Sequence, residues 1–285
     1  MKRTFTGIAL PALLAFCLVW LGCGSSSTGP EDGDNDYSAV KDFYHRFDVA
    51  GQTGLRVEAI SGTVTVRGVA GSDSVVIKGV MRVEAPSQAD ADARLAGLDV
   101  IVRSVQEEIS AETSQPSDTE GRSYEVDYEI TMPAEMTVLV SSVNGDITVQ
   151  DIASELTVSS VNGDITIQDG AGELTVSSTN GVVILDGFEG DASISVVNGS
   201  VVGDVTLPQY GQITMVVVNG SITLEIPEET SADFSAQVVN GFIGTHELDF
   251  TDLETTLTSI TGILGDGEGT IDIVVTNGNI VVTGT

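Results

Sequence analysis

The sequence is dominated by a short repeat that follows Pro133 and runs to the C-terminus. Its clearest copy is Leu156–Glu173, LTVSSVNGDITIQDGAGE, and 13 of these 18 positions are identical in the preceding copy, Val138–Glu155. An Asn-Gly pair marks each copy, and from Asn144 the successive marks lie 18, 18, 18, 21, 21, 21 and 16 residues apart. A fixed period of about 20 residues is the signature of a repeat architecture, so the repeat constrains the fold more than any other feature does.

These marks are predicted to be corners at which the chain turns, because Gly readily adopts positive φ and Asn tolerates the neighbouring position. At one mark Thr261-Gly262 stands in place of Asn-Gly, and an isolated upstream copy, Leu55–Gly68, carries Ser61-Gly62 there. The predicted repeat corners are Asn144, Gly145, Asn162, Gly163, Asn180, Gly181, Asn198, Gly199, Asn219, Gly220, Asn240, Gly241, Asn277 and Gly278.

Each repeat alternates apolar and polar residues on both sides of its corner. In the clearest copy, Leu156 and Val158 precede the corner and Ile165 and Ile167 follow it, each separated by one polar residue. Alternation with a period of two predicts two short, half-buried strands per repeat, and no repeat contains a helical pattern.

Two architectures fit this pattern. Asn-Gly between alternating residues is the strongest local signal for a hairpin, so the repeats could form an antiparallel meander. In a β-solenoid each repeat instead forms one coil, and equivalent positions stack about 4.8 Å apart. The solenoid is favoured because a parallel stack places identical residues side by side, whereas hairpin partners need complementary residues. It predicts a buried asparagine column in which Asn162 bonds to Asn144 and Asn180.

The first residues of the chain are predicted to be a targeting segment rather than part of the fold. Residues 1–22 have the order of a signal peptide, with Lys2 and Arg3 preceding an apolar segment. That segment is too short to span a membrane comfortably as a permanent helix.

The Leu-Gly-Cys sequence that ends at Cys23 resembles the lipobox of bacterial lipoproteins, although Trp20 stands where leucine is expected. This resemblance implies lipid attachment at Cys23, and the alternative is ordinary secretion with cleavage nearby. Residues 23–41 are predicted to be a lipid-anchored flexible linker, residues 42–133 an N-terminal β-rich part with one helix, and residues 134–285 the solenoid repeats.

One helix is predicted in the N-terminal part, over Ser87–Gly97. Ser87 can cap its first turn, Asp90 stands at the capping-box position, and Gly can end it. The flanking segments Leu98–Ser104 and Tyr124–Met132 alternate in polarity and are predicted to be strands.

From about residue 43 onward the chain resembles a family of adhesin-like domains of unknown function from the bacterial envelope. The resemblance is carried by VEAISGTVTV around Ser61-Gly62, by YEVDYEITMP at Tyr124–Pro133, and by SSVNGDITV at Ser141–Val149 with its copies. It implies an all-β fold, a right-handed β-solenoid of 18–21-residue coils with a smaller mixed β region and one helix at its N-terminal side. These motifs are structural, and they carry no catalytic residues.

The chain is strongly acidic, with 42 Asp and Glu against 11 Lys and Arg and a formal net charge of −31. No Lys or Arg follows Arg122, so the repeats are purely anionic. Because phosphate binding needs a basic surface, nucleic acid is excluded as a partner. The charge is interpreted as a solvated, self-repelling surface.

The alternative use of this charge is cation binding. Asp146 and Asp164 would stack on adjacent coils, and Asp151, Asp169 and Asp186 would form a second column of oxygen ligands. The solvated surface is favoured, because the calcium-binding repeat G-G-x-G-x-D is absent. No metal site and no cofactor are therefore predicted.

Signals for an enzyme are weak. His45 is interpreted as a packed or exposed residue and His246 as part of a loop, and neither has a sequence partner for nucleophilic or metal chemistry. The motifs G-x-S-x-G and H-E-x-x-H do not occur. Phe188, Tyr210 and Phe250 are predicted to cover coil ends rather than to bind sugars.

The sequence therefore favours a non-enzymatic cell-envelope lipoprotein, an adhesin-like surface binding or structural module held at the outer membrane or cell surface by its N-terminal lipid. Its expected partners are that membrane and a protein or glycan ligand. One alternative is a glycan-active hydrolase with paired carboxylates, which act when about 5–10 Å apart. The other is an envelope-stress sensor or scaffold that binds a protein partner.

Overall fold

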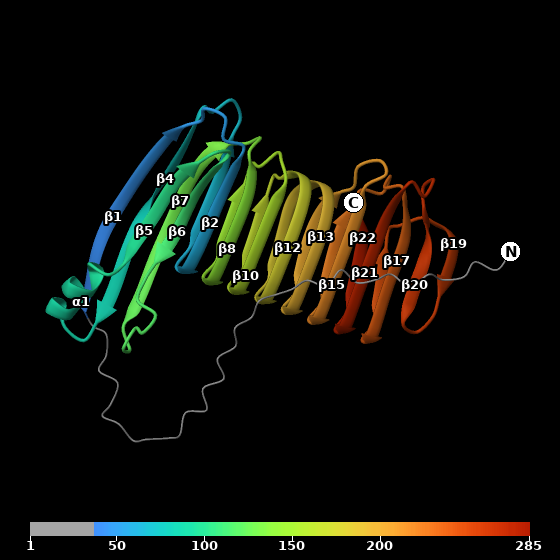
Figure 1. The fold of residues 1–285 in the computed structure, drawn as a ribbon. Coiled ribbons are helices and arrows are strands. Elements are labelled where there is room, and N and C mark those ends of the chain that lie inside the picture. The colour runs from blue at the N-terminus through green and yellow to red at the C-terminus, as the bar shows by residue number, and fades with distance from the viewer. Residues whose placement is uncertain (1–36) are drawn as a thin grey trace, which may run out of the picture. The chain divides into compact units, whose positions relative to one another are not determined.

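The computed structural model describes residues 37–285, so the predicted signal peptide, Cys23 and the linker up to residue 36 lie outside the described part. Within this range the chain forms 22 strands and one short helix, α1 (Gln88–Leu95). Strands of successive repeats lie side by side along the molecule (Figure 1), and their inward side chains form one continuous core. The predicted fold class, an all-β solenoid with a mixed β region and one helix at its N-terminal side, is confirmed.

The strands form two layers that are joined into one hydrogen-bonded sheet because β13 runs through both. Layer A contains, in spatial order, β5 (Asp99–Val105), β6 (Glu108–Ser114), β2 (Gly54–Ser61), β8 (Thr137–Asn144), β10 (Leu156–Asn162), β12 (Ala171–Asn180), the second part of β13 (Val183–Asn198), β15 (Gln212–Asn219), β21 (Gly269–Asn277), β17 (Ala232–Asn240), β20 (Ser259–Leu264) and β19 (Phe250–Thr255). Layer B contains β1 (Tyr37–Asp48), β4 (Ser74–Ala85), β7 (Ser123–Pro133), β3 (Val64–Val69), β9 (Ile147–Gln150), β11 (Ile165–Gln168), the first part of β13, β14 (Val201–Thr206), β16 (Ile222–Ile226), β22 (Ile280–Gly284) and β18 (Ile243–His246).

The repeats stack as parallel coils and not as hairpins. Leu156 of β10 lies beside Leu174 of β12 on one side and Val138 of β8 on the other, in parallel register. Equivalent positions of successive repeats therefore become neighbours, which is the arrangement expected from their near identity. Every strand in the interior of the stack bonds to a coil on each side, so the identical sequence serves both neighbours.

The alternation in each coil separates core from surface. Val158 of layer A and Ile165 and Ile167 of layer B are buried, whereas the intervening Thr157 and Thr166 point outward and are half-buried. One coil alone cannot bury such side chains on all sides, so the core is completed only by stacking.

The order of coils in the stack differs from their order in the chain at both ends. At the C-terminal end, β21 lies between β15 and β17, and β22 lies between β16 and β18. The last coil of the chain is thus inserted between two earlier coils. At the N-terminal end, the isolated copy around Ser61 joins the stack directly, because β2 pairs with β8 and Ser61 lies beside Asn144.

The prediction that Thr261-Gly262 replaces an Asn-Gly corner is wrong. Thr261 lies within β20, where it faces Ser235 of β17 in an antiparallel pair. The segment from β19 to β20 is a hairpin that covers the end of layer A, and Phe250 packs against Phe234 with ring centroids 5.2 Å apart. The length of a closing hairpin is set by its own turn and not by the period of the coils. The spacing of 21 residues between Asn240 and Thr261 therefore does not mark another coil.

The folded part begins earlier than the predicted boundary at residue 42. Strand β1 starts at Tyr37 and pairs antiparallel with β4, so that Tyr37 lies beside Ala85. The polar character of this segment reflects its position at the outer edge of layer B, where most of its side chains face solvent.

The predicted helix is confirmed as α1, and the Ser87 side chain accepts a hydrogen bond from the Asp90 backbone N–H at 3.3 Å. Among the described residues no helix has the length and apolar character needed to cross a membrane.

Three serines lie inside the coils without a hydrogen-bonding partner. Ser142, Ser160 and Ser178 stack in register, are each 4 % exposed, and their hydroxyl groups have no hydrogen-bond partner among the described residues. The next coils carry Val196 and Val217 at this position. A buried hydroxyl without a partner costs about 1–3 kcal/mol, so these serines weaken the early coils.

We therefore expect Ser160→Ala to stabilise the protein by about 1 kcal/mol in urea melts, because it removes an unsatisfied hydroxyl at little cost in packing. The adjacent Ser159→Ala is the matched control, since that side chain points outward, and it should change stability by less than about 0.5 kcal/mol. A clear loss of stability for Ser160→Ala would show that the hydroxyl is hydrogen-bonded in solution.

Candidate functional site

The predicted corners join neighbouring coils through a ladder of asparagine amides. Asn162 donates from Nδ2 to Oδ1 of Asn144 at 2.9 Å and accepts from Nδ2 of Asn180 at 2.8 Å, as the solenoid interpretation requires. The same bond, at 2.8–3.0 Å, links the later rungs in the spatial order Asn180, Asn198, Asn219, Asn277 and Asn240.

The expectation that this column is buried is wrong. Asn162 and five of the other six rungs are exposed, and only Asn180 is half-buried. The chain turns outside the two layers here, where valine and isoleucine already fill the core, so the amides face water. The ladder consequently contributes the modest energy of exposed hydrogen bonds and not the larger penalty of a buried polar group.

Glycine follows each asparagine because the corners of adjacent coils nearly touch. Gly163 has φ of 138°, and a Cβ added there would lie 2.2 Å from the carbonyl oxygen of Gly145. Its N–H donates to the carbonyl oxygen of Asn180 at 3.1 Å. No other residue type fits both the backbone conformation and this spacing.

A second ladder uses the residue after the glycine at most corners, and it is interrupted at Val182, whose side chain has no acceptor. Asp146 Oδ1 accepts the backbone N–H of Asp164 at 2.8 Å, and Asp164 Oδ1 accepts that of Val182 at 2.7 Å. Ser200 and Ser221 do the same at later corners, with Oγ accepting the N–H of the next coil at 3.2 and 3.1 Å. The stacked column of Asp146 and Asp164 is therefore confirmed, and its oxygens tie coil to coil.

The second predicted aspartate column is only partly correct. Asp186 lies beside Gln168 in the adjacent strand. Gly187 therefore takes the position in register with Asp169, where Asp186 was expected. A β-bulge between Leu185 and Phe188 accompanies this change of register. Within residues 37–285 no cluster of three or more Asp, Glu, His or Cys side chains is arranged to hold a metal ion.

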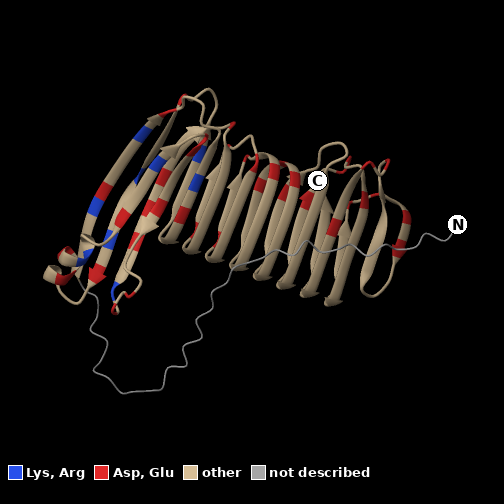
Figure 2. Ribbon diagram, viewed as in Figure 1, with Lys and Arg blue, Asp and Glu red and all other residues tan. Residues whose placement is uncertain are grey.

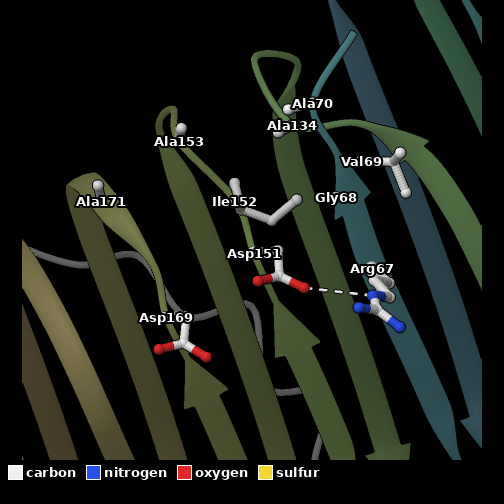
Figure 3. A pocket seen from close by; sticks show the side chains of 10 residues that line it. All are labelled: Arg67, Gly68, Val69, Ala70, Ala134, Asp151, Ile152, Ala153, Asp169 and Ala171. Carbon is white, nitrogen blue, oxygen red and sulfur yellow. Dashed lines mark hydrogen bonds and ion pairs between the residues drawn. The ribbon is translucent and has the colours of Figure 1, made fainter. Parts of the chain in front are cut away.

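A shallow groove of about 460 Å³ lies beside Asp151 and Asp169, at the edge of β3 (Figure 3). Arg67 Nε donates to Asp151 Oδ2 at 3.2 Å, and Ala134, Ala153 and Ala171 are among the residues that line it. Because the one arginine is already paired with a carboxylate and the other lining is mainly small and apolar, the groove offers little directed polar chemistry.

The outer surface of layer A carries a flat region without charge. We call it the neutral face and define it by three outward positions on each of β8, β10, β12, β13 and β15. Every one of these side chains is exposed or half-buried. The residues are Leu139, Ser141, Val143, Thr157, Ser159, Val161, Thr175, Ser177, Thr179, Ser193, Ser195, Val197, Thr214, Val216 and Val218.

Charged residues surround the neutral face. Arg56 and Glu58 occupy the equivalent positions on β2, and Asp272 does so on β21. Figure 2 shows the basic residues and many of the acidic ones gathered around β1, β4, β7 and α1, further acidic residues near the turns, and the middle strands of layer A largely free of charge. The sequence analysis did not predict this surface. The signal was present, because the outward positions before each Asn-Gly corner are mostly Ser, Thr and Val.

The basic residues are largely neutralised by neighbouring carboxylates. Arg56 contacts Glu58 and Glu108 at 3.4 and 3.2 Å. Hydrogen bonding from Arg122 lowers the pKa of Asp90, with Arg94 adding to the effect. A general acid of a glycosidase needs a raised pKa, so this carboxyl is unsuited to that role.

Within residues 37–285 the histidines and the aromatic residues are not gathered into a site. His45 is half-buried beside Phe43 with ring centroids 6.4 Å apart, and His246 ends β18 instead of lying in a loop. Phe188 is buried in the core, and Tyr210 is 73 % exposed in a turn, so only the latter lies at a coil end without cover. The most perturbed tyrosine is Tyr128, whose burial raises its pKa to about 12 while its hydroxyl bonds to Thr113 Oγ1 at 2.7 Å.

The family described as Toastrack DUF4097 matches residues 47–283. Among solved structures, the chain is similar to a candidate cell adhesion protein from Clostridium sporogenes, with 11% identity, 87% of this chain and 100% of that chain covered, and a TM-score of 0.36. A candidate adhesin from Bacteroides fragilis gives 14% identity, coverage of 86% and 97%, and a TM-score of 0.37. No curated protein matches the chain.

The corner ladder yields a quantitative expectation. Asn162→Ala removes two rungs, whereas Asn144→Ala removes one, because Ser61 occupies the corner on its other side. At about 0.5–1.5 kcal/mol per exposed bond, urea melts should show a loss of about 1–3 kcal/mol for Asn162→Ala and about half of that for Asn144→Ala. Asn162→Gly should resemble Asn162→Ala. Near-neutral behaviour of both Asn162 variants would contradict a stabilising ladder.

Proposed function

We propose that this chain, which belongs to the Toastrack DUF4097 family, is a non-enzymatic module of the cell envelope whose neutral face is its contact surface, and that the partner seated on that face is a second copy of the chain. The observation that carries the proposal is an uncharged, regularly spaced set of Ser, Thr, Val and Leu side chains on a protein with a net charge of −31. In this proposal the adhesin-like binding role uses the neutral face, and the bound partner is another copy of the chain.

Charge restricts how two copies can meet. Many other surfaces of the repeats carry carboxylates with no cation to balance them, since no Lys or Arg follows Arg122. Two such surfaces repel each other, and like charges placed opposite one another across an interface cost several kcal/mol. The neutral face is a broad region in which two copies can approach without that penalty.

The side chains of the neutral face suit packing against another sheet. Val143, Val161, Val197 and Val218 form a column along the stack and are each 38–43 % exposed. β-Branched side chains at regular spacing can interdigitate with those of a facing sheet about 10 Å away. The hydroxyl groups in the neighbouring columns can pair with one another or with trapped water.

The size of the neutral face is sufficient for a weak, reversible contact. Strands about 4.8 Å apart and alternate residues about 6.7 Å apart give a field of about 500 Å² per copy. Two copies would then bury about 1,000 Å², which is the lower limit for a specific interface. A contact of this size suits association at the high local concentration of a surface-anchored protein.

The other candidate functions have less support. A glycan hydrolase needs two carboxyl groups with separated pKa values, whereas carboxylates such as Glu58 and Glu108 flank an arginine instead. A sensor or scaffold that binds a different protein would use the same neutral face, and a heterologous partner is the outcome if copies of the chain do not associate.

The proposed cellular location rests on the sequence of the N-terminal segment. A lipid on Cys23 would hold the folded part outside the membrane at the end of a short linker. Metabolic labelling with a fatty-acid analogue is expected to mark the wild type and Cys17→Ser but not Cys23→Ser, because Cys17 lies within the predicted signal peptide. Labelling of Cys23→Ser at the wild-type level would contradict the anchor.

Self-association is tested with two charge insertions in one coil. Thr157 of β10 lies on the neutral face, and Thr166 of β11 points outward from layer B, and both are half-buried. The wild type is expected to dimerise more strongly as salt screens the acidic surroundings. Thr157→Glu should weaken dimerisation by about tenfold or more, since like charges then face each other, while Thr166→Glu should match the wild type.

Sedimentation equilibrium over a range of salt concentrations measures both effects, and circular dichroism checks that each variant is folded. A wild type that stays monomeric at every salt concentration, or equal weakening by the two substitutions, would overturn the proposal.

A further inference from the structure

The seven Asn-Gly corners have the same sequence but different chemical environments. Asn-Gly is the dipeptide most prone to spontaneous deamidation, because glycine lets its backbone nitrogen reach the preceding side chain. In that reaction the nitrogen of the glycine attacks Cγ of the asparagine. The corners differ in whether the N–H of that glycine donates a hydrogen bond to the adjacent coil.

At six of the seven corners the glycine N–H is held by the adjacent coil. It donates to the backbone carbonyl oxygen of the stacked asparagine at 2.8–3.1 Å, from Gly145, Gly163, Gly181, Gly199, Gly220 and Gly278. Each of these glycines is also half-buried. Their nitrogens can attack only after a coil separates from its neighbour, which requires local unfolding.

The corner Asn240-Gly241 is the end of the ladder. The inserted last coil lies on its inner side, where Gly278 N–H donates to the Asn240 carbonyl oxygen at 2.9 Å. No coil follows on its outer side. Within residues 37–285 the Gly241 N–H has no acceptor and the Asn240 Oδ1 has no donor, and both residues are exposed.

The closing hairpin does not cover this corner. Strand β20 pairs with β17 from Ala232 to Gln237, and the last backbone hydrogen bond between the hairpin and this segment runs from Val238 N–H to the Thr258 carbonyl oxygen at 2.9 Å. The neighbouring Val239 and Phe242 are 64 % and 56 % exposed. Water and hydroxide therefore reach the corner without any opening of the stack.

We propose that Asn240-Gly241 is a site of spontaneous deamidation in the folded protein, and that the stack protects the other six corners. The Gly241 nitrogen forms a bond to Asn240 Cγ, the Cγ–Nδ2 bond breaks, and ammonia leaves with the proton that the Gly241 nitrogen releases. Water then opens the resulting cyclic imide at either carbonyl group. The product is aspartate or isoaspartate at position 240.

The product alters the end of the stack. Asn240 Nδ2 donates to Asn277 Oδ1 at 2.8 Å, and a carboxylate in its place has no proton to donate. Isoaspartate also lengthens the main chain by one carbon atom, which disturbs the register of Asn240 with Asn277. The reaction therefore loosens the terminal rung and adds one negative charge to the end of the molecule.

Ageing the folded wild-type chain in mildly alkaline buffer, followed by peptide mass spectrometry, tests the proposal. Trypsin cannot separate the corners because no Lys or Arg follows Arg122. Cleavage after glutamate isolates Asn240 in the peptide between Glu229 and Glu247. We expect deamidation at Asn240 to be at least about tenfold faster than at the adjacent corner, Asn277, whose glycine N–H is bonded.

The same chain unfolded in urea is the matched control. All seven corners then have equivalent surroundings, so the rates at Asn240 and Asn277 should become similar. Equal rates at these two residues in the folded protein would overturn the proposal, as would a faster reaction at any other corner. A similar excess at Asn240 in urea would also overturn it, because the selectivity would then come from local sequence and not from the end of the stack.

Discussion

The structure depends on how closely the backbones of adjacent coils approach at the Asn-Gly corner. A Cβ at Gly163 would lie 2.2 Å from the carbonyl oxygen of Gly145, so the corner tolerates only glycine. That approach lets the glycine N–H bond to the next coil and brings the asparagine amides within hydrogen-bonding distance of each other. The side chain after the glycine, Asp146 in one coil and Ser200 in another, then accepts a backbone N–H from the neighbouring coil. At most corners three consecutive residues thus join one coil to the next, and the strands keep their register because the corners do.

A stack built in this way has two ends that the repeat cannot close. At the C-terminal end the chain covers layer A with the hairpin of β19 and β20, and β19 carries Asp252 and Glu254 on its open edge. Acidic residues on an edge strand discourage pairing with another chain. The last coil is inserted one place inward, between β15 and β17, so residues 232–246 gain their final neighbour only when residues 269–284 are in place. The corner at Asn240 is the part of this end that remains uncovered, and within residues 37–285 its glycine N–H has no acceptor.

The charge and the repeat together define the surfaces that can make contacts. The carboxylates that repeat along the corners accept backbone N–H groups, and many of those near arginines form ion pairs, as Asp151 does with Arg67. Their arrangement is explained by the stability of the stack. The neutral face requires another explanation, because stacking fixes only the inward residues, and any polar residue would satisfy the outward positions. Its uncharged Ser, Thr, Val and Leu side chains suit the contact between copies that we propose.

The sequence alone determined the coil. Alternation on both sides of Asn162-Gly163 gives two strands, and near identity between repeats favours a parallel stack, because each strand must serve a copy of itself on either side. It also gave the capped helix at Ser87 and the bond from Asn162 to Asn144, since these follow from local chemistry and fixed spacing. Only the tertiary structure decided the order of the coils, with β21 between β15 and β17 and the upstream copy at Ser61 beside Asn144. Every coil presents nearly the same edge to its neighbours, so the local sequence does not specify which coil lies beside which, and connection lengths and the closing hairpin settle that choice. The exposure of the ladder likewise depended on where the corner lies relative to the two layers, which the period of the repeat does not encode.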